Sequence, residues 1–132
     1  MSDRKWVCDA SPVILLAKVR RADFLLSLPN QLVIPEVVER EIASGSADSP
    51  AANWLEQNTS RLEYPNVSLS PDVADWDLGT GESSVLSWAL QRRSWTVILD
   101  DLAGRRCAKD LDLSLTRTSH ERRREAQEAV QD

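Results

Sequence analysis

The chain has 132 residues, of which 42% are hydrophobic and 28% charged, a composition typical of one soluble globular domain. Its formal net charge of −5 argues against broad nonspecific nucleic-acid binding, because an excess of Lys and Arg normally supplies that affinity. The sequence shows neither an apolar run near the ~20 residues of a bilayer span nor the apolar core of a signal peptide, so we expect a cytoplasmic protein without membrane contact.

Short apolar segments alternate with amphipathic ones along most of the chain. The predicted elements are strand 6–9, helix 12–19, helix 22–28, strand 32–34, a helix from 35, helix 50–57, strand 62–64, helix 80–93, strand 95–99, helix 104–109 and strand 111–115. Ser11 before Pro12 favours a helix start, since Ser caps free N–H groups and Pro fits a first turn. Residues 59–77 are the least regular part.

Strands that alternate with helices predict right-handed crossovers and a mostly parallel sheet with helices on both faces. We therefore expect a three-layer α/β/α fold over residues 1–115. Residues 116–132 are very polar and predict a separate tail, helical or partly disordered.

Acidic side chains occur at four places where predicted strands give way to helices, namely Asp9, Glu41, Glu82 and the pair Asp100 and Asp101. Asp9 and Asp100 follow apolar strands, whose carboxyl ends form the functional edge of such sheets. Glu41 and Glu82 lie within two turns of a helix start, Glu41 on the face of Val38 and Ile42. Carboxylates gathered without His or Cys suit hard cations, so we expect a Mg²⁺ or Mn²⁺ site for phosphate chemistry.

Each carboxylate also has an ordinary structural interpretation. Asp9 could serve a turn or cap, Glu41 could pair with an Arg, and Glu82 in a first helical turn is favourable against the helix dipole. Asp100 and Asp101 are harder to explain, because adjacent carboxylates repel and cannot both cap one helix. We place Asp101 first as the direct ligand and Asp100 in support, an order that alternation along the strand can reverse.

Four segments of the chain together resemble a known family. In order they are DASPVILLAK, VIPEVVEREI, GTGESSVLSWAL and VILDDLAGRRCAKDLDL, and they span about residues 6–115. They are similar to PIN-domain ribonucleases, in particular to a PIN-like group first described as a domain of unknown function and related to VapC-type toxins. Relatives usually continue with a Gly-Thr turn and an apolar final helix, so the polar tail is an atypical C-terminal element.

The resemblance implies an endoribonuclease that cleaves single-stranded RNA, often as the toxin of a toxin–antitoxin pair. It implies Mg²⁺ or Mn²⁺ held by the five carboxylates, water that attacks the phosphodiester in line, and one carboxylate that takes the proton. Ser11, close to the metal, and Arg105 are the candidates for substrate binding. The expected partners are an RNA substrate, a protein antitoxin and a second copy of the chain.

Two other functions remain open from the sequence. One is a PIN-like binding module that has lost turnover and acts through a protein partner, which the altered C-terminus keeps open. The other is a phosphoacceptor signalling domain, which also gathers acids at strand ends. That class needs its paired acids early and a Lys late on a strand, whereas here the pair is late and Lys109 lies in a predicted helix.

The remaining reactive side chains are given structural roles. Cys8 and Cys107 have apolar neighbours and are expected to be buried thiols. His120, in the polar tail, is not expected to act as a general base. Trp54 and Trp76 are candidates for an exposed interface, although Trp at such positions is more often core. The Arg clusters are expected mostly to face solvent.

Overall fold

The computed structural model describes residues 4–46 and 48–116. In chain order the elements are β1 (Lys5–Cys8), α1 (Ala10–Lys18), α2 (Phe24–Ser27), β2 (Gln31–Val33), α3 (Glu36–Ala43), α4 (Pro50–Gln57), a 3₁₀ turn (Thr59–Arg61), α5 (Pro71–Ala74), α6 (Thr80–Gln91), β3 (Trp95–Ile98), α7 (Leu102–Asp110) and β4 (Ser114–Thr116). No helix in this part of the chain is long and apolar enough to cross a membrane.

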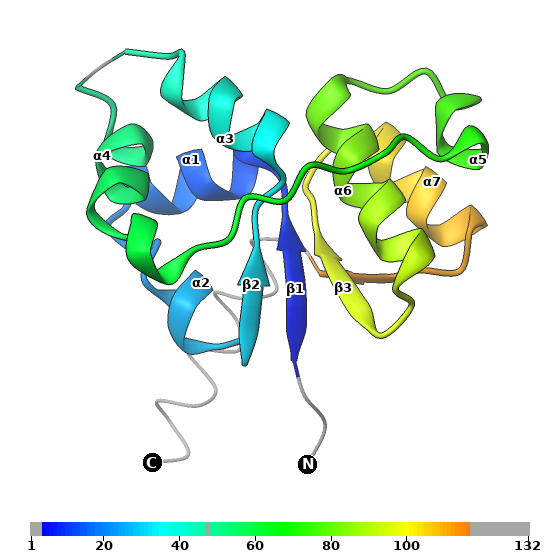
Figure 1. Cartoon of the computed structure of the whole chain (residues 1–132), viewed down its shortest axis with the longest axis horizontal. Coiled ribbons are helices and arrows are strands. Elements are labelled where there is room, and N and C mark those ends of the chain that lie inside the picture. The colour runs from blue at the N-terminus through cyan, green and yellow to red at the C-terminus, as the bar shows by residue number, and fades with distance from the viewer. Residues whose placement is uncertain (1–3, 47, 117–132) are drawn as a thin grey trace.

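The four strands form one parallel sheet in the order β2-β1-β3-β4. Helices α1, α3 and α4 gather on the left of the strands in Figure 1, and α5, α6 and α7 on the right. The three-layer α/β/α fold expected from the alternation of elements is confirmed. The strand order reverses between β1 and β3, and at such a switch point the carboxyl ends of the strands leave room for a functional site.

The core surrounds the two central strands. Val7 and Cys8 on β1 and Val97 and Ile98 on β3 are fully buried, as expected for strands of a parallel sheet covered on both faces. Cys8 and Cys107 are free and buried, which confirms their expected structural role. Burial is the main cause that raises the pKa of both thiols, so neither is a ready nucleophile.

Several element boundaries differ from those predicted. Helix α1 begins at Ala10 with Asp9 at its N-cap position, so Ser11 lies inside the first turn and does not cap it. Residues 62–64 make a single parallel bridge, Val33 to Glu63, instead of a strand. The predicted helix 22–28 shortens to α2. At the other end, α7 begins two residues earlier than expected, because Asp101 caps it.

The last strand extends one residue past the predicted end of the folded domain. Thr116 is buried, pairs with Ile98, and accepts a hydrogen bond from the Leu99 N–H at 3.1 Å. The other residues of the predicted tail, His120 among them, lie outside the described residues.

Candidate metal centre

Asp9 lies where β1 ends, and its position is fixed by the neighbouring strand. Its N–H donates to the Ile98 carbonyl of β3 at 3.1 Å, and the residue is only 5% exposed. Although it occupies the N-cap position of α1, its side chain makes no capping hydrogen bond. The capping role considered for Asp9 therefore does not account for a carboxylate held inside the protein.

Glu41 approaches Asp9 across the packed pair α3 and α6. A methyl group added to Gly81 of α6 would lie 3.2 Å from Asp9 Oδ1 and 3.8 Å from Glu41 Oε1. Val38 and Glu41 both approach Gly81, as expected for residues that share a side of α3, but Val38 and Ile42 are buried whereas Glu41 is exposed. Glu41 therefore lies at the solvent-exposed edge of the apolar face of α3, where its carboxylate can stay hydrated.

The ordinary alternative for Glu41, an ion pair with Arg, is not found in the described part of the chain. There the ion pair on α3 joins Arg40 to Glu36. The charge of Glu41 raises the pKa of both Asp9 and Glu82.

Glu82 and Asp101 meet between the first turns of α6 and α7. The Asp101 side chain caps α7 by accepting a hydrogen bond from the Gly104 N–H at 3.1 Å. It also takes part in a side-chain hydrogen bond with Glu82. Glu82 Oε2 would lie 3.1 Å from a methyl group added to Gly104, which shows how closely this carboxylate approaches α7.

Asp100 is half-buried, whereas Asp101 is exposed. Asp100 raises the pKa of both Asp9 and Cys8 through its charge. Asp101 raises the pKa of Asp9 and Glu82 in the same way. Both members of the pair therefore act on the same group of carboxylates, and Asp101 caps its helix in addition.

The electrostatics show five acidic groups that repel one another. Burial is the largest cause that raises the pKa of Asp9 from 3.8 to about 6. A hydrogen bond from the Ala10 N–H lowers this pKa, and neighbouring charges raise it again, namely those of Glu41, Asp101 and Asp100. Such an arrangement favours either protonation or a bound cation.

Glu82 shows the same behaviour. Burial is again the largest cause that raises its pKa, from 4.5 to about 7, and the charges of Asp101 and Asp9 add to it. The hydrogen bond with Asp101 also raises this pKa, because a neutral Glu82 carboxyl can donate to the Asp101 carboxylate. The raised pKa therefore favours a neutral Glu82 when no cation is present.

The donor set fits a hard divalent ion, since all five side chains offer oxygen and their like charges raise the pKa of Asp9 and Glu82. Within residues 4–46 and 48–116, however, no three acidic, His or Cys side chains already lie close enough to hold an ion together. The group is therefore electrostatically coupled but not gathered into a coordination shell. Binding of an ion requires these side chains to move toward one another.

The two proposed substrate contacts differ in their setting. Ser11 is exposed in the first turn of α1, two residues after Asp9. Arg105 lies on α7 with its N–H bonded to the Asp101 carbonyl at 2.9 Å. Its side-chain Nε is buried without a hydrogen-bond partner among the described residues. Arg105 thus lies near the start of the helix that Asp101 caps.

Sequence reasoning missed how much the site depends on glycine. The sequence places Gly104 only at the start of the predicted helix 104–109 and Gly81 inside the predicted helix 80–93. A methyl group at Gly104 would lie 2.7 Å from Leu99 Cδ2, and at Gly81 3.2 Å from Val38 Cγ2. Glycine inside a helix costs about 1 kcal/mol relative to Ala. Gly81 next to Glu82 and Gly104 close after Asp101 were therefore the available signal in the sequence that these helices pack closely at the site.

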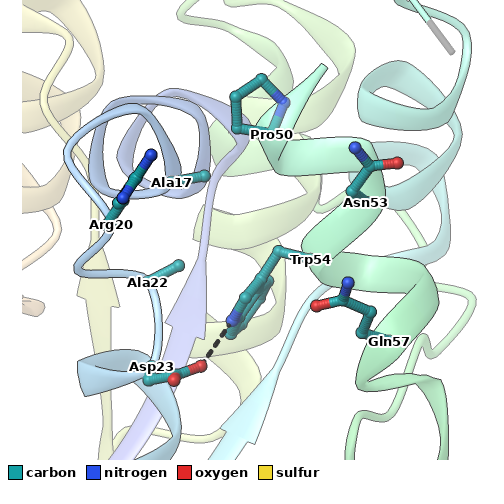
Figure 2. Close-up of a pocket in the computed structure, with 8 residues that line it drawn as sticks. All are labelled: Ala17, Arg20, Ala22, Asp23, Pro50, Asn53, Trp54 and Gln57. Atoms are coloured by element: carbon teal, nitrogen blue, oxygen red, sulfur yellow. Dashed lines mark hydrogen bonds between the residues drawn. The ribbon is translucent and has the colours of Figure 1, made fainter. Parts of the chain in front are cut away.

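A cavity of about 240 Å³ lies away from the candidate metal centre, between the end of α1 and one face of α4 (Figure 2). None of the five carboxylates lines it. Trp54 forms part of its wall and is only 8% exposed, and its Nε1 donates to Asp23 Oδ1 at 2.9 Å. Trp54 is therefore a core residue, the more frequent role expected for Trp at such positions, and not an exposed interface residue. The indole joins α4 to the segment before α2.

Comparison with known proteins adds one finding. A family model described as a PIN domain matches residues 5–119, which is most of the chain and includes all five carboxylates. A search of curated proteins finds no match.

Proposed function

We propose that this chain, which belongs to the PIN-domain family, is a divalent-metal-dependent endoribonuclease that cleaves single-stranded RNA. PIN domains are generally nucleases and typically use divalent metals. The coarser conclusion, a nuclease of this family, rests on the match. The choice of RNA as substrate and of Mg²⁺ or Mn²⁺ as the ion extends it.

One observation supports the proposal most strongly. Carboxylates from four separate elements act on one another at the carboxyl edge of the parallel sheet, and the buried one, Asp9, has its pKa raised to about 6. Apart from the helix cap that Asp101 provides, structural stability gives no reason for such a group, because neutralising these charges would relieve repulsion. Cation binding gives one.

In the proposed reaction, Asp9, Glu41, Glu82 and one or both of Asp100 and Asp101 hold the ion. When bound, the ion lowers the pKa of water and neutralises charge on the phosphate. A water molecule would form a bond to phosphorus while the bond to the leaving oxygen breaks. A carboxylate that does not hold the ion would take the proton of the water, and the leaving oxygen would take up a proton from solvent. Arg105 and Ser11 orient the phosphate by donating hydrogen bonds.

We also propose that the nuclease is a cytoplasmic toxin, paired with a protein antitoxin and active as a homodimer. Only the resemblance of the sequence to VapC-type toxins supports this part. Induced expression in a bacterial host should arrest growth, and the Asp9→Asn variant should not. Growth that is unaffected by the wild type would argue against a toxin while leaving the nuclease open.

The nuclease is tested with an unstructured RNA that carries a fluorophore and a quencher. With Mn²⁺ at pH 8 we expect cleavage by the wild type, none in chelator, and a loss on the order of 100-fold or more in Asp9→Asn. Asp75→Asn is the matched control, because Asp75 is an exposed acid at the end of α5. Equal cleavage by wild type and Asp9→Asn would refute the proposed site.

A second candidate, a binding module without turnover, is favoured by one finding. In the described part of the chain the carboxylates are not already gathered around an ion position. Calorimetric titration with Mn²⁺ separates the two candidates. Binding together with cleavage supports the nuclease, whereas absence of both supports the module.

A further inference from the structure

A second cavity, of about 160 Å³, is lined by residues of α3 and α6, the helices that carry Glu41 and Glu82 of the candidate metal centre. Thr80 and Ser84 of α6 line it, and between them in the sequence are Gly81 and Glu82 of the centre. Arg40 of α3 lines it too, directly before Glu41. Because α3 packs against α6, the same helix pair carries Glu41, Glu82 and one side of this cavity. The two sites are thus neighbours.

The charges in this cavity are already balanced. Glu36 and Arg40 both line it, and they form an ion pair with each other one helical turn apart. A phosphate group would need a cation that is not already paired. The cavity therefore does not suit a phosphate.

The other polar groups are neutral and uncommitted. Asn66, Thr80 and Ser84 line the cavity, and within residues 4–46 and 48–116 none of their side chains has a hydrogen-bond partner. Together they offer an amide and two hydroxyls, which both donate and accept. Val37 and Val67, both half-buried, add apolar surface. Hydrogen-bonding groups beside apolar surface match the edge and face of an unpaired nucleobase.

The wall that carries Asn66 is held in place by backbone hydrogen bonds. The Ile34 N–H donates to the Glu63 carbonyl at 3.0 Å, and the Glu36 N–H donates to the Pro65 carbonyl at 2.9 Å. In Figure 1 this green segment passes in front of the strands from the α4 side to α5. Asn66 therefore follows directly on a fixed backbone, as recognition of one base requires.

We propose that this cavity binds one unpaired base of the RNA, next to the phosphate held at the metal centre, and that Asn66 is its main specificity residue. Its volume is well below the ~300 Å³ of a drug-sized ligand site, which suits a single ring system. The inference rests on the proposed RNA substrate. Ser84, 9% exposed, and Thr80 complete the set of hydrogen-bonding groups.

Binding without cleavage tests the inference. In the Asp9→Asn background, which prevents cleavage, fluorescence anisotropy compares labelled oligo-A, oligo-C, oligo-G and oligo-U of equal length. We expect one base to be preferred by about 10-fold, as one good side-chain pair to a base provides. Adding Asn66→Ala should reduce the preference to about twofold or less. Asn53→Ala, an exposed Asn on α4 outside this cavity, should leave it unchanged.

A second variant guards against misfolding of the first. Ser84→Ala removes only a hydroxyl. We expect it to weaken the affinity for the preferred oligonucleotide several-fold while the melting temperature of the protein stays unchanged. Equal affinity for the four oligonucleotides, or a preference that survives both substitutions, would overturn the inference. A base preference lost in Asn66→Ala, in a chain whose wild type does not cleave, would keep the cavity and reject the nuclease. Cleavage without base preference would support the nuclease and reject the cavity as a base-binding site.

Discussion

The Asp9→Asn substitution should make the metal-free protein more stable, although it abolishes the proposed activity. The folded protein raises the pKa of Asp9 from 3.8 to about 6, a difference of about 2.2 pKa units. At about 1.36 kcal/mol for each pKa unit, the charged form costs about 3 kcal/mol at pH 8. Asn has nearly the same shape, and its carbonyl can still accept from the Ala10 N–H.

The sign of the pH dependence follows from the raised pKa. The folded state holds a proton on Asp9 more tightly than the unfolded state, so the cost is absent below about pH 4 and complete above about pH 6. At pH 5 about half of the 3 kcal/mol remains. The stability gained by Asp9→Asn should therefore shrink as the pH falls from 8 to 5.

Urea denaturation followed by Trp fluorescence measures this difference, in chelator at pH 8 and at pH 5. Asp75→Asn controls for the change in net charge. Saturating Mn²⁺ at pH 8 should stabilise the wild type and have much less effect on Asp9→Asn, because binding to the folded state adds free energy by mass action. If Asp9→Asn is no more stable than the wild type in chelator at pH 8, the argument from uncompensated charge is wrong.

Four further results are expected. Mn²⁺ affinity, measured by calorimetry, should weaken by about tenfold per pH unit below pH 6 for each proton displaced, since the carboxyls with pKa about 6 and about 7 must lose theirs. Gly104→Ala should lower the free energy of unfolding by about 1–3 kcal/mol, because its methyl group meets Leu99 Cδ2 at 2.7 Å, and an unchanged urea midpoint would contradict this. Asp101→Ala should lose about 1 kcal/mol through the missing helix cap, while Asp101→Asn keeps that stability and loses cleavage. Trp54→Phe should lose about 1 kcal/mol with its hydrogen bond to Asp23 and keep full cleavage activity.

The sequence predicted the elements whose hydrophobic pattern is strong. The buried strand from Trp95 and the helix from Pro50 to Gln57 lie where expected, because a continuous apolar run and a Ser-Pro start each determine local structure. The segment around Glu63 could not be predicted as a single bridge. Its pairing with Val33 depends on a distant strand and leaves little mark on local composition.

The candidate site was predictable in part for the same reason. Asp9 and Asp100 follow strands, so the parallel sheet brings them to one edge. Glu41 was harder, because helical spacing gives the face of a residue but not the position of its helix against α6. The close approach of Glu82 to Gly104 depends on packing between two helices, which no spacing within either helix reveals.

The burial of Asp9 at the end of β1 has a consequence for the turnover of the protein. A folded state that carries an uncompensated buried charge opens more often, and proteases cleave the open form in proportion to its population. A bound divalent ion would shift the equilibrium back toward the folded state by mass action. Degradation should therefore be fastest where the ion is scarce, so that the amount of folded protein in a cell would follow the supply of metal.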